Sequence, residues 1–170
     1  MSPLRFIQHY PASLQQQVQV LIEQNRLELS LKSRYPDWSH SVQTDAQLYD
    51  YTQILRQRYM KNAPPLAKVQ YDAKIQVIDN ALGQHRQISR VHGQRLKSKN
   101  EIRVSSLLKN LPEPLLRMVV VHELAHFKEK DHNKAFYQLC QHMEPQYHQL
   151  EFDLRLCLVL HALTEETPDV

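Results

Sequence analysis

The residues of this chain that are best suited to chemistry are two histidines four positions apart, with a glutamate directly after the first. They form the segment His122-Glu123-Leu124-Ala125-His126. Residues four apart lie on one face of an α-helix, so we expect His122 and His126 to present two imidazoles to a single metal ion. Glu123 lies about 100° round the helix from His122, and its side chain is long enough to act as a general base on a water molecule that the metal binds. The segment therefore predicts a zinc hydrolase with Glu123 as the catalytic residue.

A catalytic zinc ion usually takes three protein ligands, and His132 is the candidate for the third. The same spacing occurs in metzincins, where a glycine three residues after the second histidine lets the chain turn back to the metal. This chain has Glu129 at that position, so we expect His132 to arrive by another route, where the chain reverses before the next predicted helix. Weaker candidates for the third ligand are Glu129 itself and, more distantly, His142, Glu144 and His148. The alternatives to a metal site are two core histidines bonded to the backbone and an exposed His132.

Positive charge is concentrated just before the predicted metal-binding helix. Residues 84–109 contain seven Lys and Arg side chains against one acidic side chain, whereas the rest of the chain has a net charge of −3. A concentrated positive field attracts polyanions, and Arg side chains hold phosphate oxygens with paired donors. The predicted substrate-binding residues of this basic stretch are Arg86, Arg90, His92, Arg95 and Arg103. The alternatives are a solvated hairpin and a surface that binds nucleic acid.

Hydrophobic periodicity predicts an α+β fold. We expect helices over 12–31, 43–61, 112–127, 134–143 and 146–164, with Asn110 as a candidate N-cap of the third and Asp131 or Asn133 of the fourth. Alternating residues predict a hairpin over 68–78 with an Asp-containing turn, and further strands over 87–91 and 101–104. The expected order is N-terminal helices, a small antiparallel sheet, the active-site helix and C-terminal helices. A single domain over 1–165 and a flexible tail over 166–170 complete this prediction.

The composition excludes several classes of function. Two glycines among 170 residues are too few for a dinucleotide-binding or phosphate-binding glycine-rich loop. The two cysteines, Cys140 and Cys157, have the spacing of neither a disulfide framework nor a zinc knuckle. The sequence shows no signal-peptide pattern and no apolar run of about 18 residues. We therefore expect a cytoplasmic protein that does not enter a membrane.

Several stretches of the sequence resemble the YgjP-like metallopeptidase family, whose distant relatives are the SprT-like and WLM zinc peptidases. These stretches are residues 117–128, 132–136 and 143–147, together with Asn62-Ala63-Pro64-Pro65 and Leu111-Pro112-Glu113-Pro114. The resemblance implies a zincin-like fold with a small antiparallel sheet beside the active-site helix. It also implies His122, His126 and His132 as zinc ligands and Glu123 as the catalytic carboxylate. One departure is Val91-His92-Gly93-Gln94, where many members of the wider family have Trp-Gly-Ser-Cys.

Proteins of this family carry the names of two activities, metallopeptidase and UTP pyrophosphatase. Both would use Zn²⁺ and Glu123, with water attacking a carbonyl carbon in one case and a phosphorus in the other. The resemblance favours pyrophosphohydrolysis of UTP or another nucleoside triphosphate, with Mg²⁺ as a candidate additional ion. The alternatives are peptide-bond hydrolysis and a non-catalytic module that binds nucleic acid through residues 84–109. The expected partner is thus a nucleotide or peptide substrate.

Overall fold

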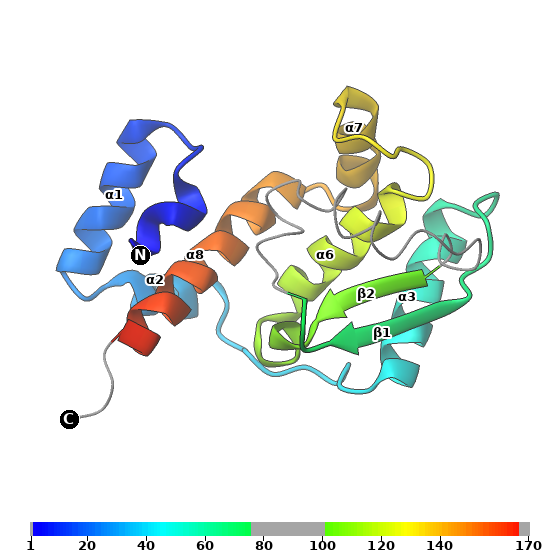
Figure 1. The fold of residues 1–170 in the computed structure, drawn as a ribbon, viewed down its shortest axis with the longest axis horizontal. Helices are drawn as coiled ribbons and strands as arrows, with labels where there is room; N and C mark the ends of the chain where they lie inside the picture. The colour runs from blue at the N-terminus through cyan, green and yellow to red at the C-terminus, as the bar shows by residue number, and fades with distance from the viewer. Residues whose placement is uncertain (1, 76–100, 167–170) are drawn as a thin grey trace.

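The computed structural model describes residues 2–75 and 101–166, and Figure 1 shows how their elements are arranged. The N-terminal part consists of the 3-10 helix η1 (Pro3–Ile7) and the helices α1 (Ala12–Glu23), α2 (Leu27–Arg34) and α3 (Asp45–Tyr59). The second part consists of the strands β1 (Lys68–Asp72) and β2 (Glu101–Ser105), the 3-10 helix η3 (Ser106–Asn110), and the helices α6 (Glu113–Ala125), α7 (Lys134–Met143) and α8 (Tyr147–Glu166). Helices before and after a small sheet agree with the predicted mixed, helix-dominated fold. No helix in the described part of the chain combines the length and the apolar composition needed to cross a membrane.

The prediction of one helix over 12–31 is wrong, because the chain breaks between α1 and α2. Helix α1 ends at Glu23, and Asn25 adopts a left-handed conformation with φ of 54°, which its short polar side chain tolerates. The N–H of Arg26 then donates to the carbonyl oxygen of Leu21 at 2.8 Å and closes the helix end. The apolar pattern continues across the break because the next buried leucines lie on α2, which packs against α8.

The two strands pair in parallel, which corrects the predicted antiparallel sheet. In their register Lys68 lies opposite Glu101, and Asp72 lies opposite Ser105. The chain does turn after β1, where the Asp72 carboxylate accepts a hydrogen bond from the backbone N–H of Lys74 at 2.8 Å, but the partner of β1 comes from much later in the sequence. Parallel strands need a connection of about a dozen residues or more, and residues 73–100 supply that length. The end of the predicted hairpin and the predicted strand over 87–91 lie outside the described residues.

Helix α6 forms the buried centre of the fold. All residues from Met118 to Ala125 are buried, because α6 contacts β2, α3, α7 and α8 on its different sides. The helix begins after Pro112, with Pro114 in its first turn, whereas Asn110, predicted as its N-cap, ends η3 instead. An apolar helix covered on several sides carries its polar residues into the interior, so the side chains of His122 and Glu123 need partners there.

The last two helices agree closely with the sequence prediction. Helix α7 spans Lys134–Met143 with Asn133 as its N-cap, and α8 spans Tyr147–Glu166. The carboxylate of Asp153 on α8 is fully buried; Arg34 pairs with it, and the hydroxyl of Tyr35 donates to it at 2.5 Å. These contacts join α8 to the end of α2. The C-terminal helix is therefore fixed against the N-terminal half of the chain.

Candidate metal centre

Three histidine side chains converge at the end of α6. The Nε2 atom of His126 lies 3.2 Å from Nε2 of His122 and 3.1 Å from Nε2 of His132, and the third separation, His122 to His132, is 3.3 Å. His122 and His126 come from α6, and His132 comes from the loop before α7. These three are the group found among the described residues that can hold a metal ion. The structure thus brings all three predicted ligands together, including His132.

The spacing of the three nitrogens fits a tetrahedral metal ion. Zinc binds imidazole nitrogen at about 2.0–2.1 Å, and two ligands at a tetrahedral angle are then about 3.3 Å apart. Imidazole donors suit zinc and several other transition metals and do not suit Mg²⁺ or Ca²⁺, which prefer oxygen. The donor set therefore fits a transition metal, with one tetrahedral position left for water or substrate.

The turn after α6 fixes the orientation of the second histidine. His126 is the C-cap of α6, and the N–H of Glu129 donates to the carbonyl oxygen of Ala125 at 2.9 Å. The carbonyl oxygen of Glu129 in turn lies 3.0 Å from Nδ1 of His126. A carbonyl oxygen only accepts hydrogen bonds, so Nδ1 carries the proton and the lone pair of a neutral ring is on Nε2. His126 thus presents an unprotonated nitrogen to the other two histidines.

Aromatic side chains surround the three imidazoles. The ring of Phe136 on α7 is fully buried, and its centroid lies 4.9 Å from His122, 4.6 Å from His126 and 4.9 Å from His132. The hydroxyl of Tyr147 at the start of α8 lies 2.7 Å from Nδ1 of His122. The sequence prediction did not include Phe136. An aromatic residue at the third position of a helix that follows a candidate ligand can indicate a ring that packs against the metal site.

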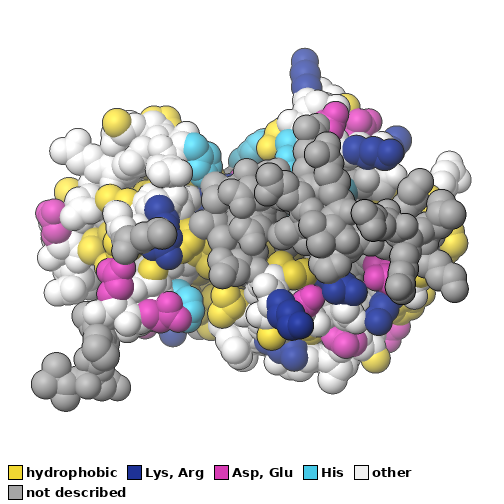
Figure 2. Space-filling view, viewed as in Figure 1, with side chains coloured by type: hydrophobic (Ala, Val, Ile, Leu, Met, Phe, Trp, Pro, Cys, Tyr) yellow, Lys and Arg dark blue, Asp and Glu magenta, His cyan; other side chains and the backbone are white. Residues whose placement is uncertain are grey.

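The second and third histidines are more exposed than the first. His122 is 6% exposed, whereas His126 and His132 are partly exposed. On the face shown in Figure 2, unassigned histidine side chains lie at the surface on both sides of a notch at the upper edge of the molecule. Tyr137 lies next to this group, with its ring centroid 6.4 Å from His132 and 5.5 Å from His148. Tyr137 is partly exposed, whereas Tyr147 is fully buried.

Glu123 is buried beside the ligands, as its position on α6 predicts. Its side chain is 5% exposed, and burial raises the pKa of the Glu123 carboxyl to about 8. Desolvation acts against the charged form, and a cation held by the neighbouring histidines would act in the opposite sense. A carboxyl whose pKa is brought near neutrality is suited to accept and return a proton.

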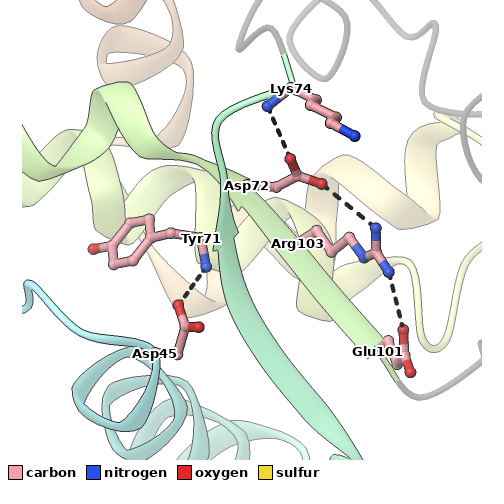
Figure 3. Close-up of polar contacts among 6 residues, drawn as sticks. All are labelled: Asp45, Tyr71, Asp72, Lys74, Glu101 and Arg103. Carbon is pink, nitrogen blue, oxygen red and sulfur yellow. Dashed lines mark hydrogen bonds and ion pairs between the residues drawn. The ribbon is translucent and has the colours of Figure 1, made fainter.

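The predicted substrate-binding residues are distributed differently. Arg86, Arg90, His92 and Arg95 lie outside the described residues. Arg103 lies on β2 between two carboxylates, with its guanidinium 3.4 Å from Asp72 and 3.8 Å from Glu101 (Figure 3). Asp72 also accepts from the backbone of Lys74, so the charge of Arg103 is balanced within the sheet.

The more distant ligand candidates have other partners. Glu144 pairs with Arg117 at 3.5 Å, and the ring of His142 lies 5.6 Å from Tyr59. Arg155 on α8 is 1% exposed and donates to the carbonyl oxygen of Phe6 at 3.0 Å. None of these three residues belongs to the group of metal-binding side chains found in the described ranges.

Comparisons with known proteins agree with this geometry. The model of a family described as YgjP-like, metallopeptidase domain, matches residues 7–156. A protein of Escherichia coli (strain K12) named UTP pyrophosphatase is 59% identical over 163 residues, which cover 96% of this chain and 97% of that protein. No solved structure matches the chain significantly. The matched region contains all three histidines and Glu123.

Proposed function

Because the chain belongs to the YgjP-like metallopeptidase-domain family, we propose that it is a zinc-dependent hydrolase that cleaves a phosphoanhydride bond of UTP or a related nucleoside triphosphate. One observation carries the proposal: three Nε2 atoms lie within 3.3 Å of one another beside a buried glutamate. A metal-dependent hydrolase needs this combination of a neutral ligand set and an adjacent proton acceptor.

His122, His126 and His132 are the proposed zinc ligands. A zinc ion held there would polarise a substrate oxygen and lower the pKa of a coordinated water toward about 7. The protein's own part is to keep the three rings in place. The Glu129 carbonyl fixes the tautomer of His126, and Phe136 packs against all three rings. Packing against the buried Phe136 ring limits how far the imidazole ligands can reorient during turnover.

Glu123 is the proposed general base. Its carboxylate would take a proton from the attacking water while the water oxygen bonds to phosphorus. As the phosphoanhydride P–O bond breaks, the same carboxyl would return the proton to the leaving phosphate oxygen. Burial raises the pKa of Glu123 to about 8, which makes its carboxylate a stronger base than an exposed one. A cation held by the histidines would lower this pKa and so populate the ionised form that accepts the proton.

The substrate class rests on the relative named UTP pyrophosphatase, which matches nearly the whole chain. We infer that Arg86, Arg90, His92, Arg95 and Arg103 hold the triphosphate, with Mg²⁺ as an additional ion on the nucleotide. For Arg103 this requires exchange of Asp72 and Glu101 for phosphate oxygens. Peptide hydrolysis is the second candidate. The family is described as a metallopeptidase domain, and the same residues could direct water to the carbonyl carbon of a peptide bond.

We further propose that residues 1–165 act as one domain and that the protein works in the cytoplasm. The contacts of α8 with η1, α2 and α6 support the first point. Two buried free cysteines support the second, because reduced thiols persist in reducing compartments.

Activity and metal content of Glu123→Gln test the mechanism. We expect the variant to keep its zinc, because Glu123 is not a ligand, and to lose about 10²–10⁴-fold in kcat on UTP. Glu165→Gln, which changes an exposed carboxylate on α8, is the matched control and should keep full activity. UMP and pyrophosphate are measured as products, and an unfolded protein is the second substrate. Equal activity of wild type and Glu123→Gln on both substrates would contradict the proposal.

Two further outcomes separate the substrate classes. If wild type does not cleave UTP, and Glu123→Gln loses activity on the unfolded protein, peptide hydrolysis replaces pyrophosphohydrolysis as the proposed activity. If neither substrate is cleaved and the protein binds DNA with a steep salt dependence, the nucleic-acid module is the better description.

A further inference from the structure

Helix α8 directs a line of buried polar side chains toward the three histidines. Tyr147, Glu151 and Arg155 follow one another at four-residue steps and so share one face of the helix. Tyr147 is 0% exposed, Arg155 is 1% exposed, and the side chain of Glu151 is 16% exposed. Buried polar groups cost free energy unless they are hydrogen-bonded, and the bonds of this line end on His122.

The hydroxyl of Tyr147 meets three groups. It lies 2.7 Å from Nδ1 of His122, it is hydrogen-bonded with the carboxyl of Glu151, and it contacts the thiol of Cys140. A hydroxyl has one proton to donate and two lone pairs that accept. A carboxylate only accepts, so the proton of Tyr147 belongs to Glu151. A lone pair of the hydroxyl then faces Nδ1 of His122, which is the donor of this hydrogen bond.

Arg155 pairs with Glu151 and favours its ionised form, which only accepts hydrogen bonds. Its Nη2 lies 3.3 Å from Oε1 of Glu151, one helical turn away. Burial raises the pKa of Glu151, and the positive charge of Arg155 opposes that rise. The other arm of the guanidinium donates to the carbonyl oxygen of Phe6 in η1. The line is thus anchored at its far end by the N-terminal segment, which the proposed chemistry does not otherwise use.

We propose that Tyr147, supported by Glu151 and Arg155, is a positioning residue that holds His122 with its proton on Nδ1 and its lone pair on Nε2. The inference deepens the proposed function, since it takes Nε2 of His122 as a metal ligand. The Glu129 carbonyl does the same for His126, so two of the three imidazoles are oriented by a hydrogen bond at Nδ1. Partners of this kind typically change metal affinity by about 10–100-fold when they are removed.

Zinc affinity of Tyr147→Phe, measured by competition with a chromogenic chelator, is the first test. We expect zinc binding to weaken by about 10–100-fold. The matched control is Tyr71→Phe, which also removes a buried tyrosine hydroxyl, one that donates to the carbonyl oxygen of Val42 at 2.6 Å. Tyr71 lies on β1, so its variant should bind zinc as wild type does. Unchanged affinity in Tyr147→Phe, or an equal loss in both variants, overturns the inference.

Histidine NMR is the second test and does not depend on activity. In ¹⁵N-labelled wild-type protein, with and without Zn²⁺, His122 should show a protonated, slowly exchanging Nδ1. In Tyr147→Phe that proton should exchange faster, and in Tyr71→Phe it should not change. Glu151→Gln keeps an accepting oxygen, so its zinc affinity should stay within about threefold of wild type. A wild-type His122 with its proton on Nε2 overturns the inference.

The two tests distinguish this inference from the proposed function. If wild type binds no zinc, or if Glu123→Gln stays active, the hydrolase proposal fails, while the tautomer of His122 in the metal-free protein still decides the role of Tyr147. If zinc binds, Glu123→Gln is inactive and Tyr147→Phe is indistinguishable from wild type, the hydrolase proposal stands and the positioning role is wrong.

Discussion

The side-chain oxygen of Asn133 accepts a hydrogen bond from the backbone N–H of Phe136 at 2.9 Å. This N-cap links the residue directly after His132 to the aromatic ring that packs against all three imidazoles. The N–H of Asn133 also donates to the carbonyl oxygen of Asp131 at 2.8 Å, so both neighbours of His132 take part in the turn. The route by which the third histidine reaches the site is therefore a helix N-terminus and needs no glycine.

Removal of this cap should affect both folding and metal binding. We expect Asn133→Ala to lower the free energy of unfolding by about 1 kcal/mol, measured by urea denaturation, and to weaken zinc binding several-fold because His132 loses its fixed turn. Thr44→Ala is the control: Thr44 caps α3 with a capping box, far along the chain from the histidines. It should show a similar loss of stability with unchanged zinc affinity. Equal zinc affinities of the two variants would show that the cap does not position His132.

His132 itself should be required for metal binding. Its Nε2 lies 3.1 Å from that of His126, so His132→Ala removes one of three donors and should reduce bound zinc from about one ion per chain to a small fraction after dialysis. His161→Ala, which changes a half-exposed histidine paired with Glu165, should retain full occupancy. Elemental analysis of the two purified proteins provides the measurement. Full occupancy in His132→Ala would remove His132 from the ligand set.

The local patterns that identified the site depended on short-range geometry. His122, Glu123 and His126 were proposed from helical spacing alone. The preference for Asp or Asn at an N-cap left Asp131 and Asn133 as alternatives, and the structure has Asn133. The position of His132 depends on how the chain turns back in the tertiary structure. Its spacing in the sequence therefore made it a candidate ligand but left open that it is an exposed loop residue. The contact of Tyr147 with His122 could not be predicted from the sequence, because it depends on how α8 packs against α6.

The errors in the fold prediction have similar causes. Alternation of apolar residues identified both strands but carries no information on their direction, so the parallel pairing of β1 and β2 was missed. The break at Asn25 was missed because the apolar period continues on both sides of it. In both cases tertiary packing decided between arrangements that share one local pattern.

The buried carboxylate of Asp153 should contribute strongly to stability. It accepts hydrogen bonds from Tyr35 and Gln149 and pairs with Arg34, which joins α2 to α8. Asp153→Asn keeps the shape of the side chain but replaces one accepting oxygen by an NH₂ group, which cannot accept from Tyr35, Gln149 or Arg34. We therefore expect the free energy of unfolding to fall by about 2 kcal/mol. Glu165→Gln, in an exposed ion pair, should change stability by less than about 0.5 kcal/mol. A cost for Asp153→Asn as small as that of the control would mean that the cluster is dispensable.

The two cysteines should be unreactive in the folded protein. Burial raises the pKa of Cys140 and of Cys157 to about 12, so at pH 8 only about one molecule in 10⁴ has either thiolate. We expect a chromogenic disulfide reagent to react at least about 100-fold more slowly with native protein than with protein unfolded in urea. Rapid reaction of even one thiol under native conditions would contradict the burial of these side chains.

The same two thiols predict how stability changes at high pH. Their pKa is higher in the folded state than in the unfolded state, where it is near 9, so above that pH the folded protein retains protons that the unfolded chain releases. The free energy of unfolding should therefore fall as pH rises from about 9 toward 12. Cys157→Ser tests the contribution of one thiol, because a hydroxyl does not ionise in this range. Its stability relative to wild type should improve between pH 8 and pH 10, and a constant difference would show that Cys157 does not contribute to this pH dependence.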